Sequence, residues 1–184
     1  MKKNGKFSLK EITNIMEGLL KGVSCLDENR IMHRDLKPEN IMLRNQSYPY
    51  DPVIVDFGLA TNCEKTPYLF FRCGTPGYVA PEVVKLTQNA YYDPVCDVFS
   101  LGCIFHTLMT NYPLFPGVKY EEVYKKNKNL DFDIKTNLIQ NFHPAALNLL
   151  LNMLAAKPEI RIRAAEALKH QFFAGWYNVG GKKI

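Results

Sequence analysis

The chain has 184 residues, of which 47% are hydrophobic and 22% charged, and its formal net charge is +5. This length fits a single domain, which at that size buries about 70% of the surface that its unfolded chain exposes. A charge this modest favours lysines scattered over a solvated surface. We therefore expect neither a nucleic acid nor a membrane surface as the partner.

The cysteines exclude two further classes of protein. They are five in number, widely spaced and without a C-x-x-C pair, which argues against a disulfide framework and against a zinc site: Cys25, Cys63, Cys73, Cys96 and Cys103. The basic start of the chain is followed by no apolar signal-peptide region, and no run is long enough to span a membrane. We expect a protein of the cytoplasm or the nucleus.

The first predicted element is a helix that begins after Ser8. The segment Ser8-Leu9-Lys10-Glu11 has the form of a capping box, in which the Ser8 hydroxyl and the Glu11 carboxylate satisfy backbone amides reciprocally. Apolar residues then recur at helical spacing up to Val23. One face of this helix is therefore expected to be buried.

Two short strands and a long irregular segment follow. The apolar runs Ile41–Leu43 and Val53–Val55 flank a polar stretch and predict two strands joined by a loop. From Phe57 to Pro81 glycines and prolines interrupt every pattern. A loop of this length within a domain is usually functional.

The second half of the sequence predicts helices. Residues Asp97 to Met109 are apolar on nearly all sides, which indicates a central buried helix. Shorter helical patterns occupy Glu121–Lys126, Ala145–Leu154 and Ala164–Lys169. The fold class predicted is mainly α, with a few short β-strands.

Three motifs carry the chemistry: His33-Arg34-Asp35-Leu36-Lys37-Pro38-Glu39-Asn40, Asp56-Phe57-Gly58 and Ala80-Pro81-Glu82. Each alone has an ordinary explanation, since Asp-Phe-Gly is a common turn, Asp35 could cap a helix and His33 could pack in a core. Together and in this order they resemble the catalytic loop, the magnesium loop and the end of the activation segment of protein kinases. The resemblance implies a kinase C-terminal lobe over residues 1–175 and a tail over residues 176–184.

The resemblance implies a role for each polar residue of these motifs. Asp35 would accept the proton of the acceptor hydroxyl, and Lys37 would hold the transferred phosphate of ATP. Asn40 and Asp56 would bind Mg²⁺. Glu39 would lie at the cofactor and hint at basic residues beside the acceptor.

The segment Gly74–Glu82 resembles the substrate-docking loop of serine/threonine kinases, with Thr75 near Asp35. The stretches Cys73–Glu82 and Asn111–Gly117 are similar to the calcium/calmodulin-dependent kinase group. The expected substrates are therefore serine and threonine hydroxyls of proteins.

The remaining motif residues would support the site. By the resemblance, Glu82 would form an ion pair with Arg161, and Asp97 would accept hydrogen bonds from the backbone of His33 and Arg34. The alternative for Asp97 is a plain helix N-cap, a role that could hold together with the first. Phe57 and Gly58 would shape the magnesium loop; the freedom of glycine suits the turn there.

Some family motifs are absent from these 184 residues. There is no G-x-G-x-x-G loop and no V-A-I-K-like lysine after one, so we expect the N-terminal lobe to be encoded upstream. Because phosphoryl transfer depends on positioning and electrostatics, the chain alone would be nearly inactive. The alternative function is a non-catalytic kinase lobe that binds proteins.

Two substitutions depart from the family pattern. Phe71 stands where many kinases carry a phosphorylated threonine, so we expect Tyr68, Leu69, Phe70 and Phe71 to pack the activation loop through apolar contacts. Thr61, Thr66 and Tyr68 are the less favoured phosphate acceptors, with Arg34 as the anchor. Arg163 replaces the usual helix-capping Ser or Thr, a loss that costs about 1 kcal/mol.

Overall fold

The computed structural model describes residues 6–45, 47–65, 68–87, 91–132, 134 and 144–174. The proposed boundary between lobe and tail, after residue 175, lies outside this part of the chain. The described elements are α1 (Leu9–Glu28), β1 (Ile31–Met32), η1 (Pro38–Asn40), β2 (Ile41–Leu43), β3 (Pro52–Ile54), β4 (Thr61–Asn62), α2 (Pro81–Val84), α3 (Cys96–Thr110), α4 (Tyr120–Asn129), α6 (Pro144–Met153), η2 (Pro158–Ile160), α7 (Ala164–Ala167) and α8 (Gln171–Ala174). The prediction of a mainly helical fold with few short strands is confirmed.

Helix α1 begins at the predicted capping box. The backbone amide of Ser8 donates to the Glu11 carboxylate over 2.7 Å, and the amide of Glu11 donates to the Ser8 hydroxyl over 3.4 Å. The apolar stripe of the helix is buried and packs against α3, α7 and β3. The helix ends at Asn29, and Arg30 leaves it in the left-handed region, with φ 57°.

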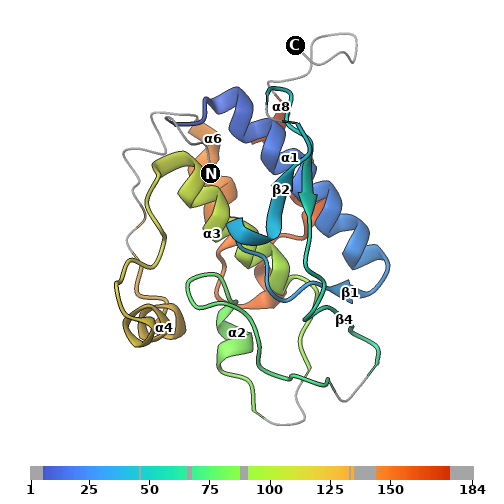
Figure 1. Cartoon of the computed structure of the whole chain (residues 1–184), viewed down its shortest axis with the longest axis vertical. Helices are drawn as coiled ribbons and strands as arrows, with labels where there is room; N and C mark the ends of the chain where they lie inside the picture. Colours follow the sequence, from blue (N-terminus) through green and yellow to red (C-terminus); the bar gives the residue numbers. More distant parts are fainter. Residues whose placement is uncertain are drawn as a thin grey trace.

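Helix α3 is the centre of the molecule. All of its residues are buried, as the sequence predicted, and it packs between α1 and α6 (Figure 1). Asn111 closes the helix in the left-handed conformation, with φ 61°, and its amide donates to the carbonyl of Thr107 over 2.8 Å. Asparagine tolerates this conformation better than most residues do.

Two small antiparallel sheets lie against these helices. Strand β2 pairs with β3, with Ile41 opposite Ile54, and β1 pairs with β4, with Ile31 opposite Asn62. The second predicted strand is thus confirmed with its bounds shifted by one residue. Along the chain, the paired strands β1 and β4 flank the paired strands β2 and β3. Residues 33–40 and 55–60 are therefore each anchored by a strand at both ends.

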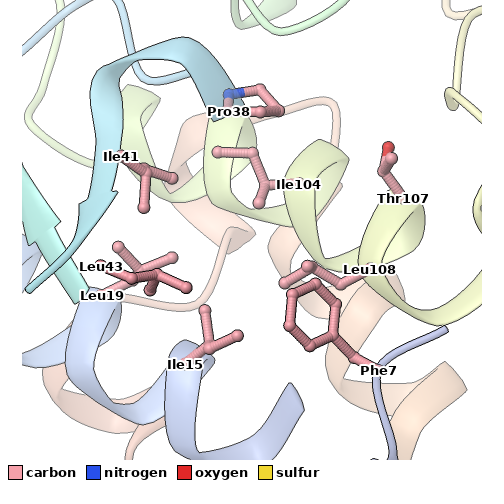
Figure 2. Close-up of a pocket in the computed structure, with 9 residues that line it drawn as sticks. All are labelled: Phe7, Ile15, Leu19, Pro38, Ile41, Leu43, Ile104, Thr107 and Leu108. Atoms are coloured by element: carbon pink, nitrogen blue, oxygen red, sulfur yellow. The ribbon is translucent and has the colours of Figure 1, made fainter. Parts of the chain in front are cut away.

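An apolar pocket lies between α1, α3 and β2 (Figure 2). It has an open volume of about 470 Å³ and is lined by Phe7, Ile15, Leu19, Pro38, Ile41, Leu43, Ile104, Thr107 and Leu108. Pro38 belongs to the catalytic-loop motif, so this pocket adjoins the back of that loop. Among the helices that the structure describes, none has the length and apolarity needed to cross a membrane.

Candidate active site

The catalytic loop, residues 33–40, is held by hydrogen bonds to helix α3. The buried carboxylate of Asp97 accepts the backbone N–H of His33 over 2.7 Å and that of Arg34 over 2.9 Å. Burial raises the pKa of Asp97, and the two backbone hydrogen bonds oppose that rise by favouring the charged form. Asp97 is not the N-cap of α3, because that position is taken by Val95. The contact implied by the kinase resemblance is present and the alternative is wrong.

His33 joins the catalytic loop to the segment after β3. It is fully buried, and its Nε2 lies 3.0 Å from the carbonyl oxygen of Val55. Its ring meets the ring of Phe57 edge-on, with the centroids 5.0 Å apart. His33 therefore occupies a packing position, and it places the catalytic loop beside the Asp-Phe-Gly segment.

The polar centre of the site consists of four side chains. One oxygen of Asp35, Oδ1, accepts the hydroxyl of Thr75 over 2.6 Å. The other, Oδ2, accepts Lys37 Nζ over 2.8 Å and Asn40 Nδ2 over 3.2 Å. Lys37 Nζ also donates to Thr75 Oγ1 over 2.9 Å. Residues from the catalytic loop and from the predicted docking loop thus meet at one carboxylate.

Asn40 and Asp56 are brought to neighbouring positions by the β2–β3 pairing. The amide of Val55 donates to the carbonyl of Asn40 over 3.0 Å, so Asp56 follows directly on the residue bonded to Asn40. Asp56 has φ 62° and its exposed carboxylate accepts the amide of Gly58 over 3.2 Å. The amide oxygen of Asn40 accepts no hydrogen bond from the part of the chain that is described.

These two oxygens suit a magnesium ion. Mg²⁺ is usually held by one or two protein oxygens together with phosphates and waters, and not by an all-protein cage. The described residues contain no group of three or more His, Cys, Asp or Glu side chains placed to hold a metal. A carboxylate and an amide oxygen fit a shared metal–phosphate site.

Glu39 is exposed. Burial, with a further contribution from the negative charge of Glu39, raises the pKa of Tyr78 to about 12. The position of Glu39 next to the substrate stays a prediction.

The predicted ion pair between Glu82 and Arg161 is present in bidentate form. Arg161 Nη1 and Nη2 lie 2.7 and 2.8 Å from the two carboxylate oxygens. The Arg161 side chain is fully buried, and its guanidinium lies over the ring of Phe99, 5.2 Å from the centroid. The pair anchors the end of the activation segment, at α2, to the C-terminal helices.

Arg34 is occupied by the activation segment itself. Its Nε donates to the carbonyl of Leu59 and its Nη1 to that of Phe70, both over 2.6 Å. Nη1 also donates to the hydroxyl of Tyr92 over 3.2 Å, and the guanidinium lies 5.7 Å from the ring centroid of Tyr68. The sequence analysis missed Tyr92, whose position in the chain gives no signal of this contact.

The predicted apolar packing of the activation loop is only partly right. Tyr68 is buried and its hydroxyl donates to the carbonyl of Cys63 over 3.1 Å. Leu69, in contrast, is 86% exposed and Phe70 is 50% exposed, so for these two side chains the prediction is wrong. Hydrogen bonds from Arg34 to the backbone hold this stretch, which leaves its side chains free to face outward. Thr66 lies outside the described residues.

At the N-cap of α7, a hydrogen bond of the Arg163 backbone compensates for the missing side-chain cap. Its backbone amide donates to the Glu166 carboxylate over 3.3 Å. Its guanidinium forms ion pairs with Asp27 over 2.9 Å and with Asp93 over 2.8 Å. The side chain that cannot cap α7 therefore links α1 to the segment before α3.

The sequence matches the protein kinase domain over residues 1–173. The chain belongs to the protein kinase family. It is 37% identical over 170 residues, 92% of its length, to a protein named probable serine/threonine-protein kinase 2 of Plasmodium falciparum. It is 30% identical over 171 residues to calcium/calmodulin-dependent protein kinase type 1 of Caenorhabditis briggsae and 33% identical over 171 residues to calcium-dependent protein kinase 5 of Plasmodium falciparum. In both comparisons 93% of the chain is covered.

These relatives confirm the resemblance to serine/threonine kinases of the calcium/calmodulin-dependent group. The aligned part makes up 32%, 47% and 29% of their respective lengths, so the chain spans less than half of each. Kinases of this family generally use ATP and Mg²⁺.

Proposed function

We propose that the protein transfers the γ-phosphoryl group of ATP to serine and threonine hydroxyls of protein substrates. The observation that supports this most directly is the carboxylate of Asp35, which contacts both Lys37 and the hydroxyl of Thr75. A carboxylate that already accepts an aliphatic hydroxyl and lies beside a cation has the groups that phosphoryl transfer to an alcohol needs.

In the proposed mechanism Asp35 orients the acceptor hydroxyl and takes its proton. The acceptor hydroxyl of a substrate would donate to Asp35 as Thr75 does, whose Oγ1 lies 2.6 Å from Asp35 Oδ1. Lys37 Nζ lies 2.8 Å from the same carboxylate and carries a positive charge toward which a phosphate oxygen could turn. In this proposal Thr75 favours the hydroxyls of serine and threonine over that of tyrosine.

Mg²⁺ and ATP would be held at Asn40 and Asp56, and when bound the ion neutralises the charge of the phosphates. The chain's contribution is the fixed placement of two oxygen ligands by the β2–β3 register. Glu39 and Lys37 belong to the same loop as Asn40 and would lie beside the bound nucleotide. Since the glycine-rich loop and its lysine are not among these 184 residues, we propose that an N-terminal lobe upstream completes the nucleotide site.

The proposed partners are proteins, and not nucleic acids or membranes. All five cysteines are free thiols, which supports a reducing compartment, the cytoplasm or the nucleus.

The decisive experiment is phosphorylation of serine, threonine and tyrosine peptides by the full protein that carries this chain. The variant Asp35→Asn should lower kcat by roughly 10²–10⁴-fold, because it removes the base while preserving shape. Asp51→Asn is the matched control, since Asp51 pairs on the surface with Arg44 and should change nothing. Equal turnover by Asp35→Asn would refute the assignment. Peptide binding without any turnover would favour the alternative, a non-catalytic binding module.

A further inference from the structure

A pocket lies beside Thr75, the residue whose hydroxyl marks the acceptor position. It has an open volume of about 420 Å³ and is lined by Arg72, Cys73, Gly74, Pro76, Val79, Val83, Val84, Tyr120 and Tyr124. Gly74 and Pro76 are the two neighbours of Thr75 in the chain. We therefore expect a peptide that brings a hydroxyl to Asp35 to place a residue close to its acceptor near this pocket.

One wall of the pocket lies against the catalytic loop. Gly74 has φ 114°, and a Cβ atom placed on it would lie 2.9 Å from the carbonyl oxygen of Arg34. Another wall is formed by residues of α2 and α4, two helices that contact each other. The pocket is thus enclosed by the docking loop and two helices.

The charge of the pocket comes from Arg72. No carboxylate side chain lines it. Arg72 is exposed, its guanidinium rests over the ring of Phe71 with 5.3 Å to the centroid, and it forms no ion pair within the described ranges. Tyr120 and Tyr124 stack with an interplanar angle of 7° and add two phenol groups to the wall. The pocket therefore offers a cation and hydroxyl donors without a countercharge.

We propose that the pocket beside Thr75 receives an acidic side chain of the substrate protein, and that Arg72 is the residue that selects it. The preferred substrate then has an acidic residue close to its acceptor hydroxyl. This inference rests on the proposed kinase function and adds the sequence preference of its substrate. The guanidinium can leave the aromatic ring and bind a carboxylate at little cost in free energy, because it leaves no buried partner behind.

The test uses the full protein that carries this chain and serine peptides that differ only in Glu, Ala or Lys at each position flanking the acceptor. The unmodified protein should prefer Glu over Lys at one flanking position by about fivefold in kcat/KM, the size expected for one partly exposed ion pair. Arg72→Glu should reverse that preference, Arg72→Gln should abolish it, and Arg72→Lys should retain most of it. The control Lys169→Glu, which makes the same charge change on an exposed position of the C-terminal part, should keep the preference.

Binding of the same peptides, measured by fluorescence anisotropy, separates this inference from the proposed function. If no peptide is phosphorylated, the kinase proposal fails, while an affinity ranking that reverses in Arg72→Glu still supports the acidic pocket. If Glu, Ala and Lys peptides are turned over and bound equally by the unmodified protein, the inference is overturned and the kinase proposal stands. An unchanged ranking in Arg72→Glu also overturns it.

Discussion

The catalytic loop, residues 33–40, and the activation segment, residues 57–80, are fixed to the same core by different means. The catalytic loop has a buried anchor, since the Asp97 carboxylate of α3 holds two of its backbone amides. The activation segment is held at Leu59 and Phe70 by Arg34, with two tyrosines beside it. At its other end, Ser100 of α3 and Asn127 of α4 bind the backbone carbonyls of Tyr78 and Val79. The catalytic loop is thus anchored directly in the core, and the first part of the activation segment is attached to the core through Arg34.

Loss of the buried anchor should have the largest effect. Asp97→Ala leaves the amides of His33 and Arg34 buried without an acceptor, and we expect the free energy of unfolding to fall by about 3 kcal/mol. Urea unfolding of the full protein measures this. Asp97→Asn keeps one acceptor oxygen and should lose clearly less. Equal losses in the two variants would show that packing, and not the two hydrogen bonds, holds the loop.

Loss of the outer attachment should have a smaller and local effect. Tyr92→Phe removes one hydrogen bond to Arg34, worth about 1 kcal/mol. Hydrogen exchange should then accelerate several-fold in residues 59–71, while residues 33–40 keep their protection. Tyr112→Phe, at an exposed position away from Arg34, is the control. Accelerated exchange in both regions would mean that the two regions open as one cooperative unit and are not held separately.

The smallest expected effect concerns the border between the two regions, at Tyr78. Its folded-state pKa of about 12 lies above the ordinary value of 10.0, because burial and then Glu39 disfavour the phenolate. The folded state therefore holds this proton more tightly, so the stability it contributes is complete below pH 10 and is lost as the pH rises through 12. Alkaline unfolding followed by tyrosine absorbance should show this loss. It should be reduced in Glu39→Gln and reduced further in Tyr78→Phe, where the loss that remains comes from other groups whose pKa burial also raises, such as Tyr92. Identical profiles would contradict the assigned causes.

The sequence was sufficient where the signal is local. The capping box of α1 and the all-round apolar pattern of α3 each lie within one stretch of chain, and both predictions are confirmed. The resemblance to kinases likewise named residues that the fold then brings together, Asp35, Lys37 and Thr75. The pairing of Glu82 with Arg161 also followed from the resemblance and not from any local pattern.

The failures concern contacts between distant segments. Arg34 and Tyr92 are 58 residues apart, and no periodicity links them. Leu69 and Phe70 were expected to be buried because they are apolar, yet backbone hydrogen bonds fix their stretch and no core needs their side chains. Strands β1 and β4 have two residues each, which is too short for any alternation to appear.

The nesting of the two sheets has a consequence for how the site tolerates change in length. The innermost turn, between β2 and β3, lies at the closed end of the nested pairing, away from the loops that hold Asp35 and Asp56. Residues added at the exposed positions 47–49 of that connection lengthen it at the surface without moving either loop. A single residue added within β2 or β3 would instead slip the pairing and turn alternate side chains to the opposite face. A change in length is thus tolerated in the connection between β2 and β3. The hydrogen bonds between these two strands set the spacing of Asn40 and Asp56.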